Sequence, residues 1–131
     1  SHEVVATAAD IEDTLFGARP FAEVVIAELD AAPVGFILWF PNYSTFLGRP
    51  GIHIEDLFVL PQMRGRGIGR CLLAWVARVA QERGCGRVEW SVLDWNEPAL
   101  RFYASIGAEA RTEWVLQRLT GASLARLAAE F

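Results

Sequence analysis

Nine residues near the middle of the chain, PQMRGRGIG at 61–69, contain three glycines and two arginines. The segment before them, IHIEDLFVL at 52–60, has the composition of a buried strand, and apolar residues recur at helical spacing after them. A glycine-rich passage from a strand into a helix exposes several backbone N–H groups, and the helix N-terminus adds partial positive charge. The segment therefore predicts a binding site for an anionic group such as a diphosphate, with further positive charge from Arg64, Arg66 and Arg70.

Two familiar phosphate-binding patterns do not fit this segment. The Walker pattern places a lysine after its last glycine, and the whole chain contains no lysine. The dinucleotide pattern GxGxxG requires a glycine where Arg70 or Leu72 stands, depending on which glycine begins it. What remains is R-x-x-G-x-G from Arg64 to Gly69. An ordinary strand-to-helix turn is the alternative, although such a turn needs one glycine rather than three.

Composition and charge favour one globular domain. The 131 residues suit a single domain, and a hydrophobic content of 53% suffices for a core. A net charge of −4 argues against nucleic-acid and membrane partners, which favour a basic surface. Cys71 and Cys85 are too few for a disulfide framework and lack metal-ligand spacing, so no metal is expected. The chain shows neither a secretory signal nor an apolar run of about 18 residues, and we expect it to be cytoplasmic.

Hydrophobic periodicity predicts helices and strands in one α/β or α+β fold with a mixed sheet. The strand at 52–60, the helix after it and the next strand form a βαβ crossover, which is expected to be right-handed. Residues 41–51 are predicted to form a loop longer than a structural turn requires. The expected strands are 21–29, 34–40, 52–60, 87–93 and 112–119, and the expected helices are 7–15, 68–83, 97–106 and 123–131.

Two motifs together resemble a known family. R-x-x-G-x-G between a strand and a helix resembles the acyl-CoA diphosphate loop of the Gcn5-related N-acetyltransferase (GNAT) superfamily. The segment DWNEPALRFY at 94–103, followed by Gly107, resembles the N-x-x-A-x-x-F-Y-x-x-x-G block of the same superfamily. The spacing between the two blocks also fits. The resemblance implies a single N-acetyltransferase domain over residues 1–131 that uses acetyl-CoA.

Further details resemble the diamine acetyltransferase branch, which includes spermidine/spermine and thialysine acetyltransferases. The matching segments are EDLFV at 55–59, FG at 16–17 with PF at 20–21, DWNEP at 94–98 and EW at 113–114. The match is expected to run from about residue 3 to residue 119. The initial strand and helix of the superfamily have no counterpart here, so we expect that they are missing from the given chain or that a partner supplies that edge. The family is commonly dimeric, and a homodimer is expected.

The resemblance assigns the cofactor-binding residues. It implies that one strand splays from its neighbour and that the pantetheine arm of CoA adds to the exposed backbone, where an N–H group also faces the thioester oxygen. It places the diphosphate on the glycine loop and the CoA arm near Asn96, which also suits a helix cap. The expected cofactor-binding residues are Leu57, Phe58, Val59, Arg64, Gly65, Arg66, Gly67, Ile68, Gly69, Arg70, Asn96, Pro98 and Tyr103.

The catalytic assignments follow from the same motifs. Tyr103 is the candidate general acid for the departing thiolate, since a phenol is a suitable donor to a thiolate; a core aromatic is the alternative. Glu55 is the candidate base that accepts the proton of the amine, directly or through water. Asp56 is its neighbour, and in a regular strand the two side chains face opposite sides, so only one lines a given pocket. Asp56 would then pair with an arginine, while His53 shares the face of Glu55. Two solvated acids at the start of a strand are the alternative.

The expected substrate is a small cationic amine, such as a polyamine or a lysine-like amino acid. Tyr43, Thr45 and Phe46 are expected to wall a pocket for an alkyl amine, because aromatic faces attract ammonium groups. The further candidates for substrate binding are Glu55, Asp56, Glu89 and Trp90. Two other functions stay open at this point: acetylation of a protein at a lysine or an N-terminus, and a CoA-binding module without catalysis.

Overall fold

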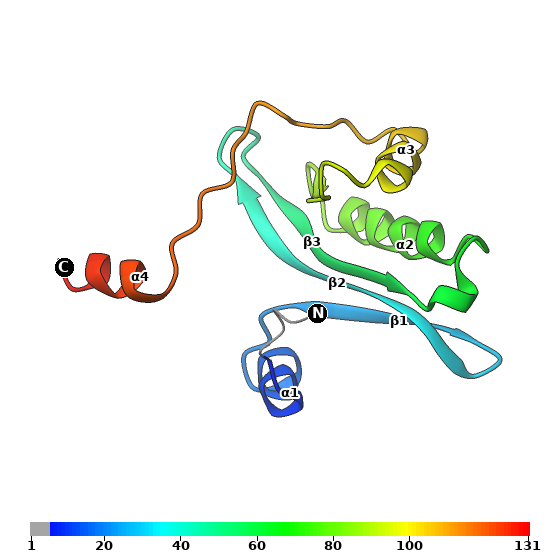
Figure 1. Ribbon diagram of the computed structural model, residues 1–131, viewed down its shortest axis with the longest axis horizontal. Helices are drawn as coiled ribbons and strands as arrows, with labels where there is room; N and C mark the ends of the chain where they lie inside the picture. The colour runs from blue at the N-terminus through cyan, green and yellow to red at the C-terminus, as the bar shows by residue number, and fades with distance from the viewer. Residues whose placement is uncertain (1–5) are drawn as a thin grey trace. The chain divides into compact units, whose positions relative to one another are not determined.

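The computed structural model describes residues 6–131, and its centre is a mixed sheet of four strands (Figure 1). The order is β1-β2-β3-β4; the first three strands are antiparallel, and β4 pairs with β3 in parallel. This arrangement confirms the mixed α/β fold. The bounds are β1 (Glu23–Leu29), β2 (Ala32–Ser44), β3 (Arg49–Val59) and β4 (Val88–Trp90).

The contacts of the chain divide it into two compact units. Residues up to 91 contain the sheet, α1 (Ala8–Phe16), a short 3-10 helix η1 (Pro61–Met63) and α2 (Ile68–Glu82). Residues 92–131 contain α3 (Glu97–Ser105) and α4 (Gly121–Ala128). Among the described residues, no helix is both long and apolar enough to cross a bilayer.

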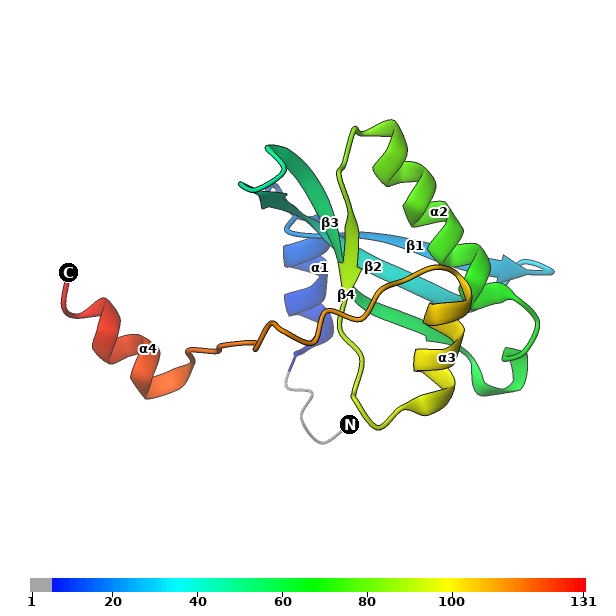
Figure 2. The same cartoon turned by 90° about the horizontal axis from the view of Figure 1, so that it is seen from above.

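The core of the first unit lies between α2 and one face of the sheet (Figure 2). Ile37 of β2, Ile52 of β3 and Val76 of α2 are its most deeply buried large side chains. Fully burying such a side chain contributes about 1.5–3 kcal/mol, so this contact holds the βαβ unit together. Trp75, which the helical pattern places on the apolar face, is instead 54% exposed. The buried stripe of α2 consists of Leu72, Leu73, Val76 and Ala80.

Caps and one ion pair define the ends of these elements. Thr7 and Asp10 form the predicted capping box at the start of α1. Gly84, with a φ of +72°, follows α2 and donates its N–H to the carbonyl of Gln81, as expected of a helix stop. Arg83 at the end of α2 holds Glu23 of β1 with two hydrogen bonds of 2.6 and 2.7 Å, and the guanidinium lowers the pKa of that carboxyl.

Two sequence-based expectations about secondary structure are wrong. Residues 41–51 are not a long loop: β2 continues to Ser44, β3 begins at Arg49, and residues 45–48 make the turn between them. Residues 112–119, expected as a fifth strand, are irregular and join no ladder in the described part of the chain. Strand propensity expresses the fit to a neighbouring strand, and no segment of the sheet pairs with this one.

Candidate active site

The glycine loop joins β3 to α2 through η1. Gly65 and Gly67 have φ angles of +81° and +82°, which side-chain-bearing residues rarely adopt. Gly67 is the N-cap of α2 and offers no side chain for capping, and the first helical bond runs from the N–H of Cys71 to its carbonyl at 3.0 Å. The N–H groups of residues 68–70 therefore lack partners within the helix and carry its positive dipole end. This is the local geometry of an anion site.

The loop follows a strand that is paired on only one side near its end. β3 pairs with β2 from Arg49 to Val59, whereas β4 pairs with it only from Ile52 to Ile54. In the described sheet, the second edge of β3 is thus open from Glu55 to Val59 (Figure 1). Open strand edges present N–H and C=O groups that accept an extended ligand as an additional strand. The open edge leads directly toward the glycine loop, because η1 begins two residues after Val59.

β3 carries a bulge at Glu55. Leu38 of β2 pairs with Asp56, and the next residue, Trp39, pairs with Ile54, which leaves Glu55 unpaired in this ladder. A bulge bends a strand and redirects its side chains, and it requires no glycine, so the sequence contained no signal for it.

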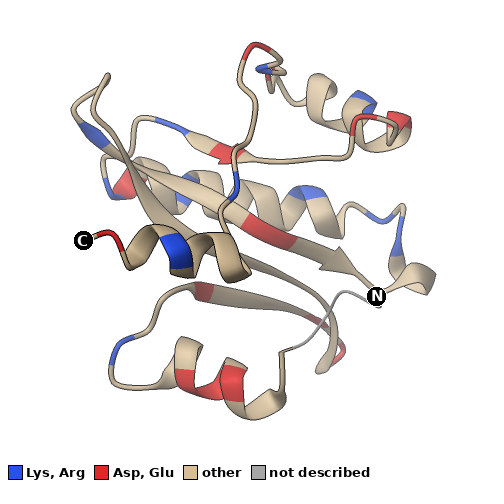
Figure 3. Ribbon diagram, turned by 60° about the vertical axis from the view of Figure 1, so that its left-hand side comes forward, with Lys and Arg blue, Asp and Glu red and all other residues tan. Residues whose placement is uncertain are grey.

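The bulge brings the two acidic residues to one face of the sheet. Phe58 and His53 lie on this face, since their rings are 5.9 and 5.0 Å from the rings of their partners on β2. Alternation along the strand places Asp56 with Phe58 and Glu55 with His53. The expectation that Glu55 and Asp56 face opposite sides is therefore wrong. Figure 3 shows acidic residues in red along β3. Both carboxylates are exposed, and among residues 6–131 no arginine forms the ion pair expected for Asp56.

The two pocket candidates on β4, Glu89 and Trp90, lie on opposite faces of the sheet. Glu89 lies opposite His53, on the face of the two acidic residues, and forms an ion pair of 3.2 Å with Arg87. Trp90 lies opposite Ile54, whose side chain is buried on the face that α2 covers. The structure thus brings Glu89, but not Trp90, to the face of Glu55.

The aromatic candidates lie at the other end of β3. Tyr43 is in the last part of β2 opposite Pro50, and Thr45 and Phe46 are in the turn that follows. Tyr43 is 63% exposed and Phe46 is 96% exposed, so neither side chain walls a pocket within the first unit. Their assignment to an amine pocket stays a prediction.

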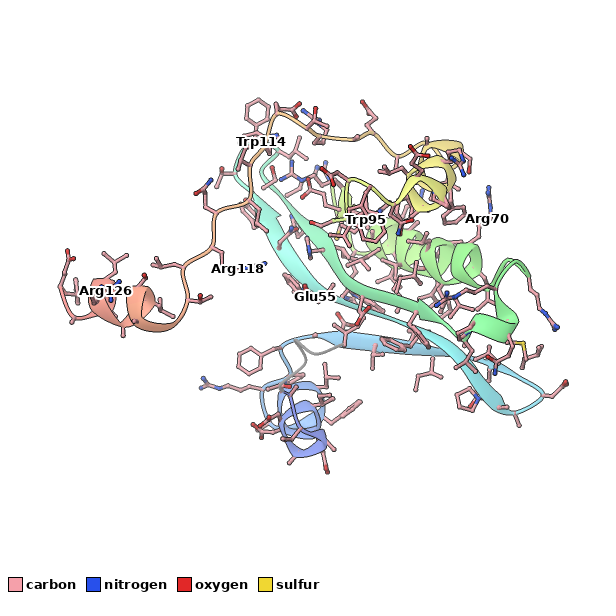
Figure 4. All side chains as sticks on the ribbon, in the orientation of Figure 1. Glu55, Arg70, Trp95, Trp114, Arg118 and Arg126 are labelled. Carbon is pink, nitrogen blue, oxygen red and sulfur yellow. The ribbon has the colours of Figure 1, made fainter. Side chains whose placement is uncertain are left out.

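The arginines of the loop differ in their contacts. Arg64 donates its Nε–H to the carbonyl oxygen of Val59 at 3.1 Å, and its guanidinium carbon lies 5.9 Å from the centre of the Phe58 ring. Arg66 and Arg70 are exposed and have no ion-pair partner in the part of the chain that the structure describes. Arg70 projects outward from the first turn of α2, while Glu55 lies along β3 (Figure 4). The contact of Arg64 was not anticipated from the sequence.

The remaining candidates are on α3, in the second unit. Asn96 caps this helix, because its Oδ1 accepts a hydrogen bond from the N–H of Ala99 at 3.3 Å, and Pro98 occupies the first turn. The ring of Tyr103 lies 5.6 Å from that of Phe102. Partial burial raises the pKa of the Tyr103 phenol above its ordinary value near 10. The phenol is therefore protonated at neutral pH, as a proton donor must be.

Within residues 6–131, no group of three or more His, Cys, Asp or Glu side chains is placed to hold a metal ion.

Comparison with known proteins gives the family context. The Acetyltransferase (GNAT) family model matches residues 3–108. An L-ornithine N5-acetyltransferase of Arabidopsis thaliana is 34% identical over 169 aligned positions, covering 95% of this chain and 74% of the relative. A thialysine N-epsilon-acetyltransferase of Mus musculus is 37% identical over 139 positions, covering 98% of this chain and 81% of the relative. An integron cassette protein of V. cholerae has a similar structure, with a TM-score of 0.81, 28% identity, and coverage of 94% of this chain and 78% of that one.

The positive φ of Gly67 generates a testable prediction. Gly67→Val should weaken CoA binding at least tenfold, because a left-handed backbone costs a side-chain-bearing residue about 1–2 kcal/mol and more when it is β-branched. The loop would relax away from the geometry that presents its N–H groups. Binding is measured by isothermal titration calorimetry with CoA.

Gly48→Val is the matched control. Gly48 also has a positive φ, +65°, and a Cβ there meets no atom within 4 Å, as at Gly67, but it lies in the turn at the far end of β3. This variant should lose similar stability and keep its CoA affinity. Equal affinities in the two variants would contradict the anion-site assignment.

Proposed function

Because the chain belongs to the GNAT family of acetyltransferases, we propose that it transfers an acetyl group from acetyl-CoA to a primary amine of a small cationic substrate. It is an acyltransferase, and enzymes of this family use acetyl-CoA as their donor. The observation that carries the proposal is the open edge of β3, which leads into the glycine loop and bears Glu55 and Asp56 on one face. Relatives named for ornithine and thialysine support the amine class.

The backbone of the first unit would hold the acetyl donor. The outward-facing backbone groups of the open β3 edge, the N–H and C=O of Leu57 and the N–H of Val59, would pair with the amide groups of the pantetheine arm as a strand does. The N–H groups at the start of α2 would receive the diphosphate, with Arg66 and Arg70 adding positive charge. A β3 N–H facing the thioester oxygen would stabilise the negative charge that develops there, a contribution of about 2.7–4 kcal/mol per donor.

The carboxylates of β3 suit the acceptor. An amine arrives as a cation and must lose a proton before it attacks, and Glu55 would accept that proton directly or through one water. Because the bulge places Asp56 on the same face, its charge is available for a second cationic group of the same substrate. Two carboxylates on one face therefore favour a diamine or a lysine-like amino acid over a simple monoamine.

Tyr103 would complete the reaction. When the amine attacks the thioester, a C–N bond forms, the C–S bond breaks and the sulfur leaves as a thiolate, which a proton from the phenol converts to the thiol. The proton that the new amide nitrogen then loses would restore the phenol. The position of Tyr103 in the N-x-x-A-x-x-F-Y block and its raised pKa support this role. The motif alone assigns Asn96 and Pro98 to the CoA arm.

The amine specificity is tested with a thiol-release assay. Purified protein is incubated with acetyl-CoA and, separately, with diamines, lysine-like amino acids, monoamines of equal length and lysine-containing peptides. We expect release with the first two groups. Release with peptides alone would indicate a protein acetyltransferase, and tight CoA binding without release would indicate a binding module.

The two carboxylates should differ in their kinetic signatures. Glu55→Gln should lower kcat about 10²- to 10⁴-fold for every amine, because it removes the base. Asp56→Asn should raise KM about tenfold for a diamine and leave a monoamine of equal length nearly unchanged, since only the diamine carries a second cation. Glu28→Gln, at an exposed position of β1, is the control for loss of one charge. Equal effects of Asp56→Asn on both amines would contradict the second-cation role.

Removal of the phenol tests the proton donor. Tyr103→Phe should lower kcat about 10²- to 10⁴-fold while CoA affinity stays within about threefold, because the ring is kept and only the donor is lost. Burial raises the pKa of the phenol and so keeps the donor protonated at neutral pH, and wild-type kcat should show no loss from deprotonation of this group across the neutral range. Ser105→Ala, which removes a different hydroxyl from α3, is the control and should be neutral. Parallel losses of kcat and CoA affinity would indicate a packing role for Tyr103.

A further inference from the structure

Arg64 is the one arginine of the glycine loop whose side chain is engaged by the strand before it. Its Nε–H donates to the carbonyl oxygen of Val59 at 3.1 Å, its guanidinium carbon lies 5.9 Å from the centre of the Phe58 ring, and its backbone N–H donates to the carbonyl of Pro61. Two of these three contacts are with the last two residues of β3. A side chain engaged in this way is poorly placed to move toward a negative charge on a ligand. Arg66 lacks such contacts among the described residues.

The carbonyl that Arg64 occupies belongs to the open edge of β3. The N–H of Leu60 donates to the carbonyl of Val34 on β2 at 2.8 Å. In a trans peptide the C=O of Val59 points opposite to that N–H, and therefore away from β2. It is the last acceptor on the side of β3 that β4 leaves unpaired. Arg64 thus occupies the last acceptor on the open edge of β3, the carbonyl of the residue after Phe58.

We infer that Arg64 is a positioning residue that sets where a ligand arm leaves the β3 edge and enters the glycine loop, and that it does not act as a counterion of the diphosphate. This inference rests on the proposed function. Phe58 directs its own backbone groups toward β2, where it pairs with Phe36, so Leu57 and Val59 are the residues that face the open edge. With its carbonyl occupied, Val59 offers the pantetheine arm only its N–H, and Leu57 provides the last free acceptor. The same bond ties the end of β3 to the residue that follows η1, which fixes the path of the chain into Gly65 and Gly67.

Side-chain length allows a clean test of this role. In Arg64→Gln the amide nitrogen stands at the same number of bonds from Cα as the arginine Nε, so it keeps the donor to Val59 and removes the charge. Arg64→Met places a methyl group there and removes both. Arg64→Lys keeps the charge but places a methylene where the donor was, with the ammonium one bond further.

CoA affinity, measured by isothermal titration calorimetry, ranks these three variants. We expect Arg64→Gln to bind within about threefold of the wild type, and Arg64→Met and Arg64→Lys to bind about tenfold or more weakly, the worth of one hydrogen bond to a charged group. Arg66→Gln, Arg66→Met and Arg66→Lys form the matched series, in which only the lysine variant should retain affinity. Thermal unfolding of each variant verifies that it is folded.

The opposite ranking would overturn the inference. Retained affinity in Arg64→Lys with equal losses in the glutamine and methionine variants would make Arg64 a counterion, and wild-type affinity in all three would leave it no role. Acetyl transfer is measured separately: a wild type that binds CoA without acetylating any amine contradicts the proposed function, while the affinity ranking still decides the role of Arg64. A wild type that does not bind CoA contradicts both.

Discussion

The unequal pairing of β3 is the constraint on which the candidate site depends. Within the sheet that residues 6–131 form, β2 covers one edge of this strand along its full length, and β4 covers the other over Ile52 to Ile54 only. Backbone polar groups normally have partners, so an open edge beside a buried core is either protected or used. Here Arg64 occupies its last carbonyl, and the residues before it remain available to a ligand with amide groups of its own.

The open edge of β3 is held in place by the packing of α2 against the face of the sheet opposite to Glu55 and Asp56. Ile37, Ile52 and Val76 are buried in the contact between the sheet and α2, so packing fixes the helix against the strand that precedes it. In the turn between them, Gly65 and Gly67 adopt left-handed backbone angles that present N–H groups at the helix start. A rigid core thus supports a site made largely of backbone.

The acidic pair on β3 shows how a local irregularity changes the available chemistry. In a regular strand, Glu55 and Asp56 would divide between the core face and the exposed face, and one carboxylate would have to be buried against α2. The bulge avoids the large cost of burying an unpaired charge and at the same time gives the exposed face two negative groups. The proposed acceptor, a cation with two charged groups, would complement that face.

The sequence by itself determined the mixed fold, the capping of α1 and α3, the stop of α2 at Gly84, and the glycine loop between strand and helix. Each of these follows from neighbouring residues: spacing sets the buried face of a helix, and cap or glycine chemistry sets its ends. The tertiary structure decided the rest. The continuous β2–β3 hairpin, the bulge at Glu55, the contact of Arg64 with Val59 and the irregular course of residues 112–119 all depend on which backbone groups find partners. Which backbone groups pair and which stay open is settled only when the segments have folded together, and no local pattern of residues contains that outcome.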